Sequence, residues 1–347
     1  MNALTSPPRA TVSFRGIDTL VECAPEETIL LAGLRHGLAL TYDCASGGCG
    51  SCRAQLTYGS VRPRWDAATG LSARDRSKGN RILMCQSLPQ GHCEVLAPLS
   101  DAIPARSEPR PARLRGRLAL RESLSADTAR FVFDVSEPVI YLPGQYVLLE
   151  FPDGVRRAYS MTRSSGETAV TSLELLVRAK PSGAATEWLF ERFVPGSDLI
   201  IEGPYGKAYA QSPRESPVLC LAGGTGLAPI LAIAEELAVH SPERRIDLYV
   251  GSRRMADIVF AERLTSLVNA GVRVVSVVET NPDSAHPLLG RTRTGLALDH
   301  LADDWPDLAL HDIYMAGPAP MIDAALVRLV KDGTARADRI YFDRFLA

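Results

Sequence analysis

The chain has 347 residues, of which 46% are hydrophobic and 22% charged, and its formal net charge is −2. This length predicts two or three domains, and the near-neutral charge gives no reason to expect a nucleic acid or a membrane surface as a partner. Seven cysteines are too few for a disulfide scaffold of this size. The first residues lack the pattern of a signal peptide, and no apolar run is long enough to span a membrane. We therefore expect a cytoplasmic protein.

The first hundred residues predict a small α+β domain. Residues 11–24 alternate apolar and polar side chains, as a short hairpin does. Two carboxylates, Glu26 and Glu27, then precede an apolar stretch with helical spacing, which ends at Gly37. Further strands are predicted at residues 53–56, 82–84 and 92–95.

Three cysteines follow that helix at the spacing C-x4-C-x2-C, and a fourth stands far downstream; they are Cys44, Cys49, Cys52 and Cys85. This is the spacing of the plant-type ferredoxin loop, in which three thiolates and a distant fourth hold a [2Fe–2S] cluster. The glycines between them allow tight turns and let backbone amides face the sulfurs. A zinc site or a disulfide framework is the alternative, but zinc sites mostly use two C-x2-C pairs and only one is present.

This part of the chain resembles the plant-type ferredoxins. The resemblance implies a β-grasp domain in which the four cysteines ligate the cluster. His92 and Glu94 flank another cysteine, but we interpret them as part of a strand with a solvent-facing histidine. The cysteines outside the motif are interpreted as reduced core thiols; they are Cys23, Cys93 and Cys220.

Residues 98–113 contain four prolines among small and basic residues, which is typical of an extended linker. From residue 113 to about residue 210 the sequence changes to short alternating strands, separated by turn dipeptides such as Pro143-Gly144. A series of this kind favours an antiparallel barrel.

The predicted barrel contains the tetrapeptide Arg157-Ala158-Tyr159-Ser160, which matches the R-x-Y-S pattern of the ferredoxin–NADP reductase flavoproteins. On a strand, Arg157 and Tyr159 would share one face. A guanidinium can bind a pyrophosphate through two hydrogen bonds, and a tyrosine ring can lie against an isoalloxazine. The resemblance implies that Ser160 lies near flavin N5, which makes Tyr159 and Ser160 the candidate catalytic residues. An exposed arginine beside a half-buried tyrosine is the alternative interpretation.

The segments that follow strengthen this resemblance. A helix is predicted to begin at Ser182-Gly183-Ala184-Ala185-Thr186, where free N–H groups favour a phosphate. In that family, Ser182, Gly183 and Thr186 would lie near the flavin pyrophosphate. Residues 202–206 match the segment that closes the domain in the family. We therefore expect FAD; FMN is the alternative, used by members that carry the ferredoxin domain last.

After residue 213 the pattern changes to continuous apolar runs that alternate with helical stretches. Strands are predicted at residues 218–222, 246–250, 272–278 and 313–316. Helices are predicted at residues 228–240, 258–267 and 321–330. This alternation predicts a doubly wound parallel sheet.

The first turn of this sheet is Gly223-Gly224-Thr225-Gly226-Leu227-Ala228-Pro229, between a strand and a helix. It matches the G-G-T-G-x-x-P of the same reductase family, in which the helix start receives the NAD(P)H pyrophosphate. A glycine-rich turn without a ligand is the alternative. A second family signature, C-G-P-x-x-M, occurs with Ala316 in place of the cysteine, followed by Gly317 and Pro318. The thiol that lies near the nicotinamide in relatives is therefore absent.

The second strand of this domain ends near Arg253 and Arg254, which could accept a 2′-phosphate or be solvated. Family members with a leading ferredoxin domain mostly use NADH, so we expect NADH, with NADPH as the alternative. The chain ends in an aromatic segment that includes Phe345. In relatives the last residues approach the flavin, and a core strand is the other interpretation.

We thus predict a ferredoxin domain at residues 1–100, a linker at 101–112, an FAD-binding barrel at 113–212 and an NAD(P)H-binding domain at 213–347. This order resembles the reductase components of bacterial ring-hydroxylating dioxygenases and multicomponent monooxygenases. The resemblance implies electron flow from NADH to FAD to [2Fe–2S] to a terminal oxygenase or monooxygenase component, directly or through a separate ferredoxin. A reductase for a deoxysugar dehydratase and a binding scaffold without cofactors are the alternatives. The intact cysteines and Arg157 argue against the scaffold.

Overall fold

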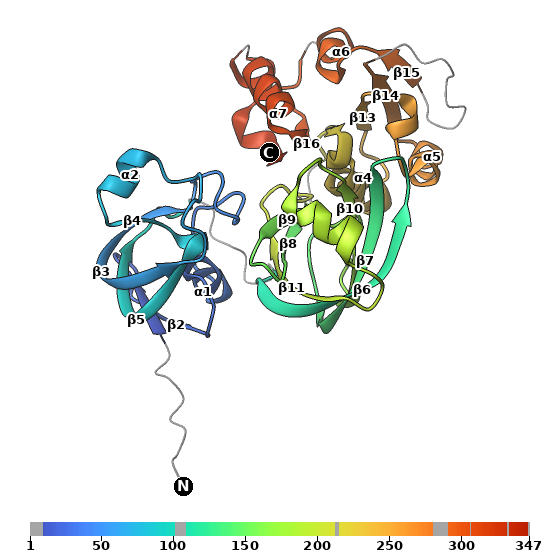
Figure 1. Cartoon of the computed structure of the whole chain (residues 1–347). Coiled ribbons are helices and arrows are strands. Elements are labelled where there is room, and N and C mark those ends of the chain that lie inside the picture. Colours follow the sequence, from blue (N-terminus) through green and yellow to red (C-terminus); the bar gives the residue numbers. More distant parts are fainter. Residues whose placement is uncertain are drawn as a thin grey trace. The chain divides into compact units, whose positions relative to one another are not determined.

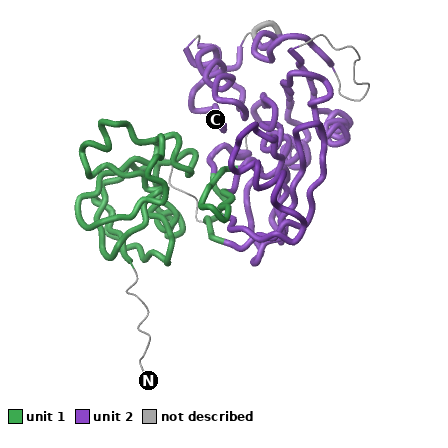
Figure 2. The backbone as a smooth tube through the Cα atoms, in the orientation of Figure 1, with its two compact units in different colours: residues 1–113, 148–158, 202–205 green, residues 114–147, 159–201, 206–347 purple. Residues whose placement is uncertain are grey.

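The computed structural model describes residues 10–100, 109–211, 215–279, 291–305, 307–331 and 333–345. The backbone forms two compact units, coloured green and purple in Figure 2. The first unit comprises Met1–Arg113, Leu148–Ala158 and Glu202–Tyr205, and the second comprises the remaining segments up to Ala347. Most of the expected linker and the expected boundary at residues 212–213 lie outside the described residues.

The first hundred residues form the expected small α+β fold. Its five-stranded sheet has the order β2-β1-β5-β3-β4, and β1 pairs parallel with β5 (Figure 1). The strands are β1 (Ala10–Phe14), β2 (Leu20–Cys23), β3 (Arg53–Pro63), β4 (Arg81–Leu83) and β5 (Ser87–Leu96). Helix α1 (Ile29–Arg35) begins after Thr28, whose hydroxyl accepts a hydrogen bond from the Leu31 amide at 3.3 Å. The short helix α2 (Ala73–Ser77) and a single turn, η1 (Met84–Gln86), complete the fold.

The middle of the chain forms the expected antiparallel barrel sheet, with strand order β10-β7-β6-β11-β8-β9. Its strands are β6 (Ala112–Ser123), β7 (Thr128–Val139), β8 (Tyr146–Glu150), β9 (Arg156–Ser160), β10 (Val170–Arg178) and β11 (Asp198–Tyr205). The helix expected after Ser182 is short: α3 (Ala184–Glu187) continues as a π-helical turn, η2 (Trp188–Arg192).

The last part of the chain is the expected doubly wound sheet, with all its paired strands parallel and the order β15-β14-β13-β12-β16-β17. Its strands are β12 (Val218–Gly223), β13 (Ile246–Ser252), β14 (Arg273–Val278), β15 (Arg291–Thr294), β16 (Asp312–Pro318) and β17 (Ile340–Phe345). Helices α4 (Leu227–His240) and α5 (Ala261–Asn269) bury Leu231 and Leu264 in one core cluster. Helices α6 (Ala297–Asp304) and α7 (Ala319–Leu326) bury Leu301 and Ile322 in another. The strand order reverses between β12 and β16, where open sheets bind ligands.

Two helices differ from their expected bounds. Helix α5 begins only at Ala261, because Phe260 takes a left-handed conformation (φ 61°) after the single turn η4 (Met255–Asp257). Helix α7 ends at Leu326, and the next residues form a π-helical turn, η5 (Val327–Lys331). Strands β11 and β15 and helix α6 were not predicted as elements. Among the described residues, no helix has both the length and the apolar character needed to cross a membrane.

Candidate cluster, flavin and nicotinamide sites

The four cysteines of the motif gather between the loop at residues 44–52 and η1. The sulfurs of Cys52 and Cys85 are 3.2 Å apart. Backbone amides face the other two sulfurs: the Cys49 amide donates to Cys44 Sγ and the Ser51 amide to Cys49 Sγ, both at 3.4 Å. The loop and η1 together therefore supply four thiols, and the loop adds the amide donors that stabilise thiolates.

The thiols stand in two hydrogen-bonded pairs. The hydrogen bond with Cys49 lowers the pKa of Cys44 to about 5, and the hydrogen bond between Cys52 and Cys85 lowers the pKa of Cys52. The same two hydrogen bonds, together with burial, raise the pKa values of Cys49 and Cys85. Across the residues that the structure describes, no three His, Cys, Asp or Glu side chains are arranged to hold a single metal ion. Two thiol pairs instead suit a two-iron cluster with two thiolates on each iron.

The R-x-Y-S tetrapeptide lies on strand β9, as expected. Arg157 is exposed and Tyr159 half-buried, whereas Arg156 and Ser160, on the opposite face of the strand, are buried. The guanidinium of Arg157 donates to the Arg156 carbonyl (2.8 Å), and no carboxylate in the described part of the chain pairs with it. It is thus in a position to meet an anionic group.

The turn before α3 is braced by Thr186. Its hydroxyl donates to the carbonyls of Lys180 (3.1 Å) and Gly183 (3.0 Å) and accepts from the Lys180 amide (3.2 Å). Gly183 is the N-cap of α3, and Ser182 has a positive φ of 58°. Because the Thr186 hydroxyl is engaged within the turn, we expect the backbone amides to be the donors for a phosphate.

The two glycine motifs of the nicotinamide region meet at the reversal of strand order. A Cβ added to Gly226 would lie 2.0 Å from the Ala316 carbonyl oxygen, and one added to Gly223 would lie 2.5 Å from Met321 Sδ. The absence of side chains thus lets the turn after β12 approach the end of β16 and the start of α7. Helix α4 continues from a single turn, η3 (Gly224–Gly226), whose last bond is from the Leu227 amide to the Gly224 carbonyl. No side chain caps η3, so the amides at its start are the ones placed to meet an anion.

The end of β13 contains a pair that the sequence analysis missed. Arg254 makes a salt bridge with Asp257, with 2.8 Å between Nη2 and Oδ1. The hydrogen bond to Asp257 also raises the pKa of Arg254. The i, i+3 spacing of the two residues is the signal that could have revealed it. A carboxylate at this position reduces the positive charge available for a 2′-phosphate.

The C-terminal segment forms a strand, one of its two expected interpretations. In β17, Phe345 pairs with Pro318 of β16, so Phe345 stands at the same sheet end as the second glycine motif. Its half-buried ring packs against the core of the sheet. An approach of Phe345 to the flavin stays a prediction.

Arg263 of α5 joins the parallel sheet to the barrel, which no sequence pattern indicated. It donates to the carbonyl of Thr162 (2.6 Å), two residues after Ser160, and binds both carboxylate oxygens of Glu235 (2.7 and 2.6 Å). It also approaches Glu174 of β10 at 3.4 Å. These contacts hold α4 and α5 to the segment that follows the R-x-Y-S tetrapeptide.

Comparison with known proteins matches three domain families in succession. The 2Fe-2S iron-sulfur cluster binding domain matches residues 13–90, the oxidoreductase FAD-binding domain residues 115–209 and the oxidoreductase NAD-binding domain residues 220–326. The chain is 42% identical, over 93% of its length and 97% of the relative's, to the ferredoxin–NAD(+) reductase component of an alkene monooxygenase system from Xanthobacter autotrophicus. It is 32% identical to a ferredoxin–NAD(P)(+) reductase of Metapseudomonas resinovorans, over 93% and 96% of the two chains. The solved structure of the ferredoxin reductase in carbazole 1,9a-dioxygenase is 30% identical, with a TM-score of 0.84 and coverage of 97% and 99%.

Proposed function

Because the chain belongs to the ferredoxin–NAD(P)+ reductase components of oxygenase systems, we propose that it carries electrons from NADH to a terminal oxygenase. It is an iron–sulfur flavoprotein oxidoreductase with sites for [2Fe–2S], FAD and a nicotinamide dinucleotide. The observation that carries the proposal is the presence, in one chain, of four paired thiols and of two glycine motifs that meet at the switch point of a parallel sheet. We also propose the domain bounds 1–100, 113–212 and 213–347, and a cytoplasmic location.

The residues of this chain bind and orient the cofactors. Once bound, FAD takes the electron pair of the hydride and a [2Fe–2S] centre carries electrons singly. The dinucleotide pyrophosphate would bind in the turn before α4, at Gly223, Gly224, Thr225 and Gly226. Gly317 and Pro318 would lie beside the nicotinamide. Arg157, with the turn at Ser182, Gly183 and Thr186, would bind the FAD pyrophosphate, and Tyr159 and Ser160 would face the isoalloxazine. The cluster ligands would be Cys44, Cys49, Cys52 and Cys85.

NADH rather than NADPH is supported by the surroundings of the second strand end. Arg254 is paired with Asp257, so one of the two arginines expected to attract a 2′-phosphate is already neutralised.

Anaerobic absorption spectroscopy of the full-length protein tests the proposal. The oxidised protein should show flavin and iron–sulfur bands, and both should bleach on addition of NADH. Absence of either set of bands would overturn the reductase assignment. Oxygen uptake should then appear when the reduced protein is mixed with a terminal oxygenase component and its substrate, and a lack of transfer to such a component would contradict the proposed partner.

A further inference from the structure

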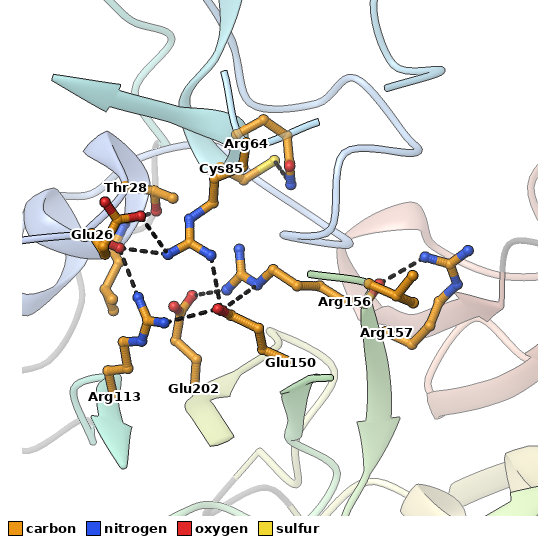
Figure 3. Close-up of polar contacts among 12 residues, drawn as sticks. Glu26, Thr28, Arg64, Cys85, Arg113, Glu150, Arg156, Arg157 and Glu202 are labelled. Carbon is orange, nitrogen blue, oxygen red and sulfur yellow. Dashed lines mark hydrogen bonds and ion pairs between the residues drawn. The ribbon is translucent and has the colours of Figure 1, made fainter. Parts of the chain in front are cut away.

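Five charged side chains from separate segments meet inside the first compact unit, and we call them the Glu150 cluster (Figure 3). The Glu150 carboxylate, at the end of β8, lies 2.8 Å from Arg64 Nη1 and 2.9 Å from Arg113 Nη2. Arg156 of β9 lies 3.5 Å from Glu150 and 2.5 Å from Glu202 of β11. Glu150 is thus contacted by three arginines.

The cluster is largely removed from water. The exposed fraction is 2% for the Glu202 side chain, 5% for Arg156, 11% for Arg64 and 16% for Glu150. Burial acts to lower the pKa of Arg156, but Glu202, Tyr205 and Glu150 together outweigh it and raise that pKa. Outside the five, the Glu26 carbonyl accepts from Arg64 (2.7 Å) and Arg113 (2.8 Å), and its exposed carboxylate lies 3.9 Å from Arg64. Glu150 and Glu202 are the two buried carboxylates that face the three arginines. Buried charges without partners are strongly unfavourable, so the five side chains can pack together only while their segments stay docked.

On one side the cluster reaches the proposed ligands of the iron–sulfur centre. The Arg64 amide donates to the carbonyl of Gln86 (2.7 Å), the residue after Cys85. The side-chain amide of Gln86 lies 3.7 Å from Cys85 Sγ. A second connection runs through Tyr205. Its hydroxyl donates to Glu202 Oε1 (2.7 Å), and its ring packs edge to face against the ring of Tyr42, two residues before Cys44.

On the other side the cluster reaches the flavin motif. Arg156 precedes Arg157 on β9, and the two side chains occupy opposite faces of the strand. Glu150 is the last residue of β8 and Arg156 the first of β9. In the short connection between them, the Phe151 amide donates to the Val155 carbonyl at 2.9 Å. The Glu150 cluster therefore connects the segment that carries Cys85 to the strand that carries Arg157.

We infer that Glu150 is a positioning residue for electron transfer, which holds the iron–sulfur segment of the chain on strands β8, β9 and β11 through the buried arginines. This inference rests on the proposed function. Electron transfer between two centres slows steeply as their separation grows, so a loosened cluster would impair the step from flavin to iron–sulfur centre. The reduction of the flavin by NADH uses the glycine motifs and Arg157 and would be unaffected.

The test compares Glu150→Gln with Asp198→Asn in the full-length protein. Asp198 pairs with Arg117 in the same barrel, but its side chain is 47% exposed, so its loss should change little. In anaerobic stopped-flow experiments, Glu150→Gln should keep the wild-type rate of flavin reduction by NADH and lose about tenfold or more in the rate of cluster reduction. A purely structural defect would slow both steps or neither.

Hydrogen exchange gives a readout that does not depend on the cofactors' reactions. In Glu150→Gln, the amides of residues 61–64 and 148–156 should exchange faster than in the wild type, whereas those of β12 and β13 should not change. Unchanged exchange together with an unchanged rate of cluster reduction would overturn the inference. If Glu150→Gln fails to retain FAD or iron, Arg113→Gln removes one contact at a less buried site, and the same two readouts should shift in the same direction by a smaller factor.

The two proposals fail in different ways. If the protein shows no flavin or iron–sulfur absorption, the proposed function fails, but the exchange comparison still reports on the Glu150 cluster. If both cofactors are present and reduced normally in Glu150→Gln, the reductase assignment stands and the positioning role of Glu150 is wrong.

Discussion

The cysteine loop at residues 44–52 and the dinucleotide turn at residues 223–226 are both rich in glycine, but glycine has a different role in each. In the cysteine loop, Gly47 and Gly50 have φ values of 93° and 79°, which let the chain bend so that the thiols converge. In the turn, Gly226 has an ordinary φ, and its missing side chain makes room for the carbonyl of Ala316. In the proposed sites, the loop would present side chains to its cofactor, whereas the turn would present its backbone. We therefore expect cofactor binding by the loop to fail when a ligand sulfur is removed, and cofactor binding by the turn to fail when a Cβ is added.

The largest expected effect is the loss of a ligand from the cysteine loop. Cys85→Ser should abolish the iron–sulfur absorption and leave FAD reduction by NADH intact, because a hydroxyl is a poor replacement for a thiolate on iron. Iron content and the visible spectrum measure it. Cys93→Ser, at a buried thiol whose pKa burial raises to about 11, is the matched control and should keep its iron. A full iron content in Cys85→Ser would refute the ligand assignment.

The turn should instead fail when a methyl group is added at Gly226. In Gly226→Ala the new Cβ would meet the Ala316 carbonyl at 2.0 Å, so β12 and β16 must move apart. We expect a loss of about 1–3 kcal/mol in the free energy of unfolding and at least a tenfold weaker binding of NADH. Thermal unfolding and titration with NADH measure the two effects.

Gly224→Ala sharpens this comparison within the same turn. Gly224 has a φ of 55° and open space around its added Cβ, so the substitution should cost only about 1 kcal/mol of backbone strain. The protein should keep most of its stability, yet bind NADH more weakly if the open space receives the pyrophosphate. Equal losses of stability in the two alanine variants would contradict the role given to close approach at Gly226.

An intermediate effect on cofactor binding is expected for Arg157, the proposed partner of the FAD pyrophosphate. Arg157→Ala should weaken FAD retention about tenfold or more, because a charge-assisted contact contributes about 1.5–3 kcal/mol. Fluorescence of FAD released on dilution measures the affinity. Arg117→Ala is the control, since Arg117 is exposed in the same barrel and pairs with Asp198. Full FAD retention in Arg157→Ala would exclude Arg157 as the phosphate ligand.

The smallest effect is expected at the edge of the nicotinamide site. Asp257→Asn frees the exposed Arg254 from its salt bridge and should raise the ratio of kcat/KM for NADPH over NADH by about threefold. Asp338→Asn removes a fully surface-exposed pair with Arg336 outside the nicotinamide site and serves as the control. A protein that already prefers NADPH would contradict the NADH proposal, and replacing Arg253 and Arg254 together by alanine should then restore preference for NADH.

Much of the fold follows from local patterns. The parallel strands β12, β13, β14 and β16 are continuous apolar runs, and their prediction needed no knowledge of neighbours. Strand β11 was not predicted as an element because Gly203 and Pro204 interrupt its alternation, and β15 because it is a short polar strand at the sheet edge. Helix α5 begins later than expected because the left-handed Phe260 sets its start.

The sequence by itself determined the cofactor chemistry, because the donor groups of each site lie close together along the chain: three thiols within nine residues, a tetrapeptide on one strand, and a glycine turn between a strand and a helix. Only the tertiary structure decided which of two neighbouring residues is buried in ion pairs and which is exposed. Arg156 and Arg157 are adjacent and chemically identical, yet one is buried between Glu150 and Glu202 and the other is exposed. Burial and ion pairing depend on which distant segments pack together, and no local spacing encodes the meeting of Arg64, Arg113 and Glu150.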